Sequence, residues 1–350
     1  MRREILLLTG IMLLIGLGIF LCGGCGGSSP DGGPKPIVMT YSVFFPPTHV
    51  QAKLARSWSD EIERRSQGRI KMMVLAGGAL TKADQCYQGV VDGITSIGMS
   101  AFAYTRGRFP LLEGLDLPLG YPDGLTATRL VDEWVRTYNP KEIQDVKILY
   151  AHAHGPGVLA SQKPVQTLEA MKGMKIRATG FSARMVEALG ASPIGMPQGE
   201  TYEALQKGVV DATFCPVETL KGWKQGEVIH SVTDSHCVGY TTTFFVAMNL
   251  EEWERLPEDL QRIFEEVSRE WVDKHGVAWN EADAAGLEFV QSLGRKIVPL
   301  DEAEQKRWVD RIAPMLDDYA ARTEKRGLPG RAFLTSLQAR LAEGKKGAAK

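Results

Sequence analysis

Arg177 is the residue whose type and position point most directly to binding chemistry. It ends the short segment "MKIR", which the sequence predicts as a strand. A guanidinium at the end of a strand can grip a carboxylate through two parallel hydrogen bonds. An isolated arginine at such a position is more often an ordinary surface residue. The surrounding sequence is therefore needed to distinguish a ligand-binding arginine from a surface one.

Cys215, His152 and His154 could support a different chemistry. A thiolate with an imidazole base within hydrogen-bond reach would be a nucleophile, but no recognised nucleophile motif surrounds Cys215. The two histidines alternate on a predicted strand and share one face without a nearby carboxylate, which favours structural histidines over metal ligands. No Walker pattern or G-x-G-x-x-G follows a strand. The sequence therefore predicts no metal, no cofactor and no catalytic residue.

The first half of the chain alternates strands and helices. Apolar residues recur at four-residue spacing from Val50 to Ile62, which predicts a helix with one apolar stripe. Strands are predicted at 37–43, 70–76, 96–102 and 146–153, and further helices at 82–93 and 125–138. This alternation is the unit of an α/β sheet. Ligands of such sheets lie beyond the carboxyl ends of strands, so the turns at 44–49, 77–84 and 101–105 are candidate walls of one cleft.

A second set of elements starts near Gly155. Strands are predicted at 158–165, 174–180, 192–196, 209–215 and 241–249, with short helices at 181–190 and 200–208. Pro257 is well placed at the start of a long helical pattern that runs to about Leu293. Because 350 residues exceed what one hydrophobic core usually organises, the two sets predict two lobes.

The N-terminus predicts export. Arg2 and Arg3 precede an apolar run at 5–21, which stops at the small residues "CGGCGGSS". The run is only just long enough to span a membrane, so an uncleaved anchor is the alternative. The exit resembles a bacterial lipoprotein signal, which implies lipidation of Cys25. Lipidation of Cys22 and two incidental cysteines are the alternatives, and a flexible Gly/Ser/Pro linker at 26–36 follows the signal at 1–25.

The composition excludes some partners and leaves one cysteine pairing open. Lys and Arg number 41 against 42 Asp and Glu, for a formal net charge of -1, and no basic stripe stands out. Nucleic acid is therefore not an expected partner. Cys86, Cys215 and Cys237 remain beyond the signal and lack the short paired spacing of a zinc site. Export permits a disulfide between Cys215 and Cys237.

Residues 171–216, "MKGMKIRATGFSARMVEALGASPIGMPQGETYEALQKGVVDATFCP", carry several ordered motifs. They resemble the signature region of the solute-binding proteins of tripartite ATP-independent periplasmic (TRAP) transporters, the DctP-like family. That family has a K-G-x-K-[IL]-R strand, a G-A-x-P-x-x-M turn and an E-x-Y-x-A-L-Q-x-G-x-V-D helix. The segments at 77–100 and 244–267 also match, and the resemblance extends from Ile37 to about Ala320.

The resemblance implies a two-lobed α/β fold like that of periplasmic binding proteins. Each lobe has a mixed sheet with helices packed around it, and the lobes are joined by crossing strands and a long helix. Residues 37–153 and about 238–256 would form the first lobe, and 154–237 with about 257–340 the second. The long helix at 257–293 would span both lobes.

The resemblance also implies a ligand site. Arg177 is at the position that makes the ionic contact with a carboxylate, Gln198 is at one that often lines the pocket, and Cys215 is where the family usually has Asn. Gly157 departs from the family, which frequently has a second arginine there, so a single permanent charge favours a monocarboxylate such as a 2-oxo or aromatic acid. Apolar or aromatic walls are expected from Phe45, Tyr104, Phe181, Trp223 and Tyr240, each with a place in the core as the alternative.

The predicted function is that of a non-catalytic receptor in the periplasm, held at the membrane by its lipid. It would bind a small organic acid between its lobes and deliver it to a TRAP-type membrane permease. Two alternatives remain at this point, a sensor that passes the binding signal to a membrane receptor and a thiol-dependent enzyme that uses Cys215.

Overall fold

The computed structural model describes the backbone of residues 35–348 and the side chains of 35–343. The apolar run at 5–21, Cys22 and Cys25 lie outside the described residues. The chain divides into compact units at 1–35 and 36–350, and the fold below is that of the second unit, which contains every sheet and core described here. Within 35–348, no helix combines the length and apolar character needed to cross a membrane.

The first sheet is mixed and is built mainly from the first half of the chain. Its strands run in the order β2 (Ile70–Ala76), β1 (Ile37–Val43), β3 (Ile97–Ala101), β10 (Thr243–Asn249) and β4 (Val146–Ala153). β1 is parallel to β2 and β3, whereas β10 is antiparallel to β3 and β4. The chain thus returns to this sheet for β10 after it has built most of the second sheet.

The second sheet is also mixed, and its strands are short. They run in the order β11 (Lys296–Pro299), β9 (Ser231–Asp234), β5 (Val158–Ser161), β8 (Ala212–Cys215), β6 (Lys175–Arg177) and β7 (Ser192–Ile194). β6 lies parallel between β7 and β8, so its carboxyl end, Arg177, is central to this half of the sheet. β9 was not predicted from the sequence, because "SVTD" has only one strongly apolar residue among its four.

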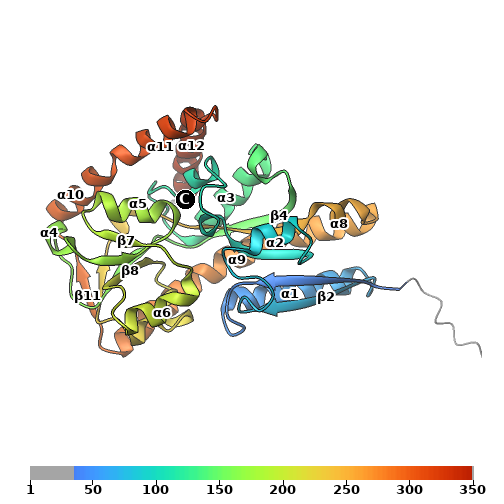
Figure 1. Ribbon diagram of the computed structural model, residues 1–350, viewed down its shortest axis with the longest axis horizontal. Helices are drawn as coiled ribbons and strands as arrows, with labels where there is room; N and C mark the ends of the chain where they lie inside the picture. Colours follow the sequence, from blue (N-terminus) through green and yellow to red (C-terminus); the bar gives the residue numbers. More distant parts are fainter. Residues whose placement is uncertain (1–34, 349–350) are drawn as a thin grey trace, which may run out of the picture. The chain divides into compact units, whose positions relative to one another are not determined.

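Helices cover both sheets. Those of the first half are α1 (Val50–Arg65), α2 (Cys86–Val91) and α3 (Gly124–Tyr138). Those around the second sheet are α4 (Leu168–Met171), α5 (Gly180–Ala188), α6 (Gln198–Gln206) and α7 (Thr219–Gly222). The later helices are α8 (Leu250–Arg255), α9 (Glu258–Ser292), α10 (Glu302–Ile312), α11 (Pro314–Glu324) and α12 (Gly330–Ala348). The α/β class with two mixed sheets is confirmed (Figure 1).

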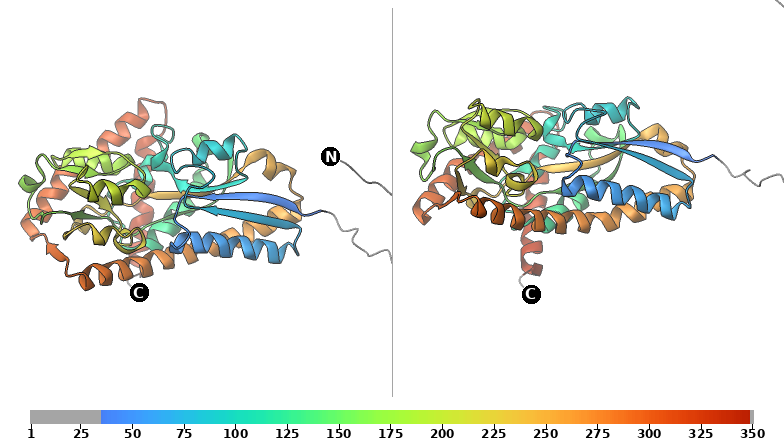
Figure 2. Two further views of the ribbon diagram at one scale, coloured as in Figure 1. Left: turned by 60° about the horizontal axis from the view of Figure 1, so that its bottom comes forward. Right: turned by 90° about the horizontal axis from the view of Figure 1, so that it is seen from below.

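Helix α9 connects the parts of the molecule that carry the two sheets. It packs against α1, α3 and β4 of the first half of the chain and against α7, which lies beside the second sheet in the chain order. Figure 2 shows α9 running along the length of the fold beside α1. Pro257 precedes it, and Glu258 and Asp259 lie in its first turn, where negative charge interacts favourably with the helix dipole. Trp279 of α9 is fully buried in the core that includes the first sheet.

The C-terminal helices contact elements of both halves of the chain. Trp308 of α10 belongs to the same core as Phe214 of β8. Phe333 of α12 packs on Trp134 of α3 with ring centroids 4.3 Å apart. The Tyr319 hydroxyl of α11 donates a 2.6 Å hydrogen bond to the Leu111 carbonyl. These helices therefore pack against α3 and the segment before it as well as against the second sheet.

A candidate ligand-binding cleft

Arg177 is held at the end of β6 with its guanidinium buried. The residue is 4% exposed, and its Nε and Nη2 donate to the Met196 carbonyl at 3.1 and 3.0 Å. Among the described residues, no carboxylate lies within 4.0 Å of this guanidinium. Burying a permanent charge without a counter-ion is costly, so the charge is suited to a ligand that brings its own negative group.

The cavity beside Arg177 is formed by segments from both halves of the chain. Its polar lining comes from Tyr104, His154, Arg177, Thr179, Ser182, Gln198, Glu218, Thr219 and Thr242, and its apolar lining from Phe44, Phe45, Pro216, Trp223, Tyr240 and Phe244. The free volume is only about 30 Å³. Sites for drug-sized ligands measure about 300–1,000 Å³, so the segments around this cavity must move apart to admit an organic acid.

Two further donors point to an acceptor-rich ligand. Nε2 of Gln198 and Nε1 of Trp223 are buried, and neither has a hydrogen-bond partner among the described residues. Both residues line the cavity with Arg177. A buried donor without a partner costs free energy. A carboxylate, whose oxygens only accept hydrogen bonds, is the chemical group that these three donors fit.

Most other ionisable side chains that line the cavity are uncharged at neutral pH. Burial lowers the pKa of His154 to about 4, so this histidine is neutral at neutral pH. Burial raises the pKa of the Tyr104 and Tyr240 hydroxyls, which therefore stay protonated. The Glu218 carboxyl group shares a 2.7 Å hydrogen bond with His49 Nε2. Glu218 therefore pairs with this histidine rather than with Arg177.

Aromatic rings form the apolar wall. Phe44 stacks with Trp223 at 5.9 Å between centroids and with Phe244 at 6.0 Å. Phe44 also meets Tyr104 edge to face at 5.5 Å. Aromatic pairs favour such offset and edge-to-face geometries. A flat apolar ligand body would therefore find preformed ring faces and edges on this side of the cavity.

The structure brings six of the eight residues expected at the site together. Phe45, Tyr104, Arg177, Gln198, Trp223 and Tyr240 line the cavity, whereas Phe181 and Cys215 do not. Phe181 faces inward from α5 into the core with Met185, and Ser182, one residue on, faces the cavity instead. Cys215, the last residue of β8, is fully buried in a core cluster, and the next residue, Pro216, contributes to the cavity lining.

Several lining residues were missed from the sequence. Phe44 belongs to the turn at 44–49 that was predicted as a wall, and Thr179 and Ser182 follow the Arg177 strand, so position along the chain was a usable signal for them. Glu218 and Phe244 gave no such signal, because their place depends on how the second sheet meets the first. His154 was predicted as structural, yet it lies on the cavity wall.

The absence of an arginine at position 157 has a steric reason. A Cβ atom built on Gly157 would lie 2.1 Å from the Tyr240 ring, far inside van der Waals contact. The Gly157 N–H also donates to the Tyr240 carbonyl at 3.1 Å. The Tyr240 ring thus takes the space that a side chain at 157 would need, and this ring lines the cavity.

The cysteine and histidine alternatives find no support in the geometry. Cys86, Cys215 and Cys237 are free thiols, so the Cys215–Cys237 disulfide that export would permit is not formed. Burial raises the pKa of Cys215 to about 12, which keeps the thiol protonated and is the opposite of what a nucleophile requires. His152 accepts a 3.1 Å hydrogen bond from the Trp279 indole at Nδ1, as a structural histidine does. Within residues 35–343, no three metal-ligating side chains cluster.

Comparison with known proteins identifies the family. Residues 41–323 match family 7 of the bacterial extracellular solute-binding proteins, DctP, and the chain belongs to this family. It is therefore a solute-binding protein of the TRAP type.

Three relatives illustrate the similarity. A TRAP solute-binding protein of Rhodoferax ferrireducens, crystallised with copurified benzoate, is 28% identical, with a TM-score of 0.84 over 89% of this chain and 99% of that chain. One from Bordetella bronchiseptica, with bound (R)- and (S)-mandelate, is 29% identical, with a TM-score of 0.81 over 88% and 99%. A monocarboxylate 2-oxoacid-binding periplasmic protein of Nostoc is 24% identical over 86% of this chain and 84% of its own length.

Proposed function

We propose that this chain is an extracytoplasmic receptor for a small organic monocarboxylate, a 2-oxo or aromatic acid, which it passes to a TRAP-type membrane permease. The observation that carries the proposal is the buried guanidinium of Arg177, which has no carboxylate within 4.0 Å among the described residues. A ligand carboxylate would supply the missing counter-ion and accept from Gln198 Nε2 and Trp223 Nε1, the two buried donors without partners.

The walls of the cavity support the ligand class. Only Arg177 contributes a permanent positive charge to the lining, which matches one carboxylate rather than two. The rings of Phe44, Trp223 and Phe244 would cover an aromatic or other apolar body. Related proteins have been crystallised with benzoate or with mandelate, and another is named as a 2-oxoacid-binding protein, in agreement with this chemistry.

Further parts of the proposal concern the setting of the receptor. We assign residues 37–153 with about 238–256 to one lobe and 154–237 with about 257–340 to the other, with α9 spanning both. We also propose that the exported protein is held at the membrane by a lipid on Cys25, with Cys22 as the alternative attachment site. The lipid would add surface attachment without a membrane-spanning segment.

The direct test is thermal unfolding of the 36–350 unit with benzoate, mandelate, 2-oxo acids, dicarboxylates and sugar acids, one at a time. An acid present at about 100 times its dissociation constant adds about 2.7 kcal/mol of stability. We expect a monocarboxylate to raise the unfolding temperature of the wild type and of Arg129→Ala, an exposed arginine on α3. Arg177→Ala should show no shift.

Arg177→Lys guards against a folding defect in the alanine variant. Lysine keeps the charge but lacks the two-pronged fork, so we expect a reduced but measurable shift. A full shift in Arg177→Ala, or no shift of the wild type by any acid, would remove Arg177 as the anchor and the proposal with it.

A further inference from the structure

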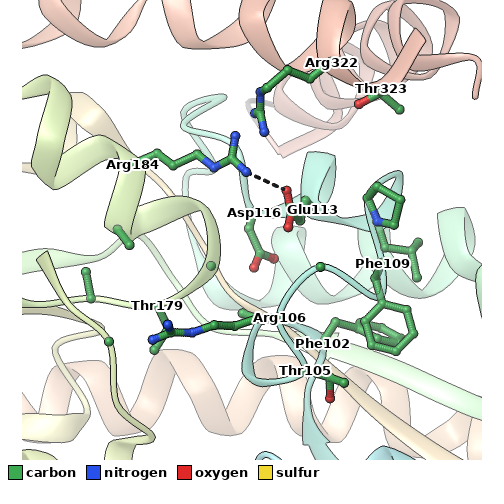
Figure 3. Close-up of a pocket in the computed structure, with 18 of the residues that line it drawn as sticks. Phe102, Thr105, Arg106, Phe109, Glu113, Asp116, Thr179, Arg184, Arg322 and Thr323 are labelled. Carbon is green, nitrogen blue, oxygen red and sulfur yellow. Dashed lines mark ion pairs between the residues drawn. The ribbon is translucent and has the colours of Figure 1, made fainter. Parts of the chain in front are cut away.

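A second and larger hollow lies next to the ligand cavity. Its volume is about 600 Å³, and it is bounded by the segment 102–116, the start of α5 and the end of α11 (Figure 3). Thr179 lines both the hollow and the inner cavity. Tyr104 of the inner cavity is followed directly by Thr105 and Arg106 of the hollow. We call it the outer hollow.

Cations gather around the outer hollow from parts of the chain that are far apart in sequence. They are Arg106 after β3, Arg184 on α5, Arg322 on α11, and Lys325 and Arg326 in the turn after it. In Figure 3 the guanidinium groups of Arg184 and Arg322 lie on one side of Asp116 and that of Arg106 on the other.

Most of these cations are not neutralised by the protein. Among the described residues, only Arg184 has an acidic partner, with its Nη2 atom 3.8 Å from Oε2 of Glu113. Arg106, Arg322, Lys325 and Arg326 have no acidic partner within 4.0 Å among residues 35–343. The formal net charge of the whole chain is only -1, so this group is a local excess rather than a reflection of a basic protein.

The carboxyl groups of the hollow offset the cations only in part. Glu113 is engaged by Arg184, and Glu187 is exposed. Asp116 is buried and accepts a hydrogen bond from the Thr243 backbone N–H at 2.8 Å. Burial raises the pKa of Asp116 to about 8, so this carboxyl is mostly neutral at neutral pH.

Arg106 connects the outer hollow to the second sheet. A Cβ atom on Gly195, after β7, would lie 1.8 Å from Nη2 of Arg106, so the guanidinium rests directly on the backbone at Gly195. Next to it, the Tyr104 hydroxyl accepts a 3.2 Å hydrogen bond from the backbone N–H of Gln198. The segment from Tyr104 to Arg106 thus lies at the boundary between the hollow and the inner cavity and bridges to the second sheet.

We propose that the outer hollow is the vestibule through which the carboxylate reaches Arg177, and that its unpaired cations capture the anion and speed its association. The inference rests on the proposed function. Clefts lined by one sign of charge raise association rates of oppositely charged ligands by ten- to a thousandfold, and the effect falls with ionic strength. The inner cavity has only about 30 Å³ of free volume, and the outer hollow shares Thr179 with it, so an anion held in the hollow would lie beside the cavity when the cleft opens.

The test is stopped-flow association with benzoate as the probe, followed by the change in tryptophan fluorescence on binding, since Trp223 lies in the cavity wall. The variant Arg106→Gln/Lys325→Gln/Arg326→Gln removes three exposed cations of the hollow. The matched control Lys53→Gln/Arg56→Gln/Arg262→Gln removes three exposed cations of α1 and α9, so both variants change the net charge equally.

We expect the association rate constant of the hollow variant to fall about tenfold at ~10 mM salt, and the difference from the wild type to vanish near ~1 M salt. The control should stay within about twofold of the wild type. Equal association rates for the two triple variants at low salt would overturn the vestibule while leaving benzoate binding, and thus the proposed function, intact.

A second measurement detects anions at the outer hollow directly and does not require a ligand bound at Arg177. Chromium tris(oxalate), a paramagnetic carboxylate anion, broadens amide NMR signals wherever anions gather. Broadening centred on Thr105–Gly107 and Lys325–Gly327, and lost in the hollow variant, is the expected result. Broadening spread evenly over the surface would overturn the anion site. If no acid binds the wild type at all, the proposed function fails and this map alone decides whether the hollow attracts anions.

Discussion

At the scale of single residues, the cleft is defined by groups that lack partners. Arg177 is buried without a carboxylate, and Gln198 Nε2 and Trp223 Nε1 are buried donors without acceptors. Because buried polar groups are nearly always hydrogen-bonded, two unpaired donors beside a buried guanidinium that lacks a counter-ion indicate a site completed by a ligand. Glu218, the one acid in the lining, is instead engaged by His49.

Gly157 is the residue at which steric fit shapes the cleft most sharply. We expect Gly157→Ala to destabilise the protein by about 1–3 kcal/mol, because its methyl group would have to displace the Tyr240 ring. In a Tyr240→Leu background the same change should cost clearly less. Urea unfolding of the four proteins measures the difference, and Gly199→Ala, whose Cβ would meet Trp223 at an ordinary 3.7 Å, serves as the control. Equal costs in both backgrounds would show that the clash with Tyr240 does not decide the choice of glycine.

At the scale of elements, the sequence predicted most strands and helices that position the site. The apolar runs of β1, β2 and β4 and the stripe of α1 carry enough periodicity to be recognised locally. β9 was missed, since a four-residue strand with one strongly apolar residue is specified by its neighbours β5 and β11.

The same limit applies to the site. Sequence motifs placed Arg177 and Gln198 at the site. They did not show which face of α5 points into the cleft, so Phe181 was predicted to line the cavity, whereas its neighbour Ser182 lines it. Glu218 and Phe244 reach the cavity only because the two sheets meet there, and no local pattern contains that information.

Strand β4 and helix α9 share a buried histidine cluster. The rings of His152 and His275 stack at 4.4 Å between centroids, and His275 Nε2 shares a 3.1 Å hydrogen bond with the Tyr150 hydroxyl. Burial lowers the pKa of His152 and lowers that of His275 to about 3 from 6.5. These histidines fold in the neutral form, so the stability linked to them is fully present above about pH 6.5 and is lost as the pH falls toward 3.

The prediction for this cluster is a change in slope. Each such histidine contributes up to about 1.4 kcal/mol of lost stability per pH unit below its unfolded pKa. We expect His275→Gln, with an amide that can still meet Tyr150, to be less stable at neutral pH but to lose stability less steeply on acidification. Urea unfolding at about pH 7, 6 and 5 measures the slope. His230→Gln, at an exposed histidine, should keep the wild-type slope, and an unchanged slope in His275→Gln would refute the linkage.

At the scale of the whole molecule, the two sheets meet over the cleft through a small number of polar contacts. His49, at the start of α1, shares a 2.7 Å hydrogen bond with Glu218, which follows β8. Tyr104, after β3, accepts from the backbone of Gln198, at the start of α6. The cleft is nearly filled in this arrangement, so we expect these contacts to open and re-form when a ligand binds. Affinity then depends on how the open and closed arrangements are balanced as well as on the ligand contacts.

Glu218→Ala tests this balance directly. The change removes a buried contact between the two halves and leaves His49 without its partner, so we expect the open arrangement to become more populated and the radius of gyration of the unliganded protein to increase. The carboxylate affinity should fall by about tenfold, since part of the binding free energy now closes the cleft. Small-angle X-ray scattering and calorimetric titration with benzoate measure the two effects. Glu203→Ala, which removes an exposed glutamate paired with Lys207 on α6, should change neither. Scattering that stays identical for Glu218→Ala and Glu203→Ala would mean that the His49–Glu218 contact does not hold the cleft closed, and any loss of affinity would then belong to the ligand contacts alone.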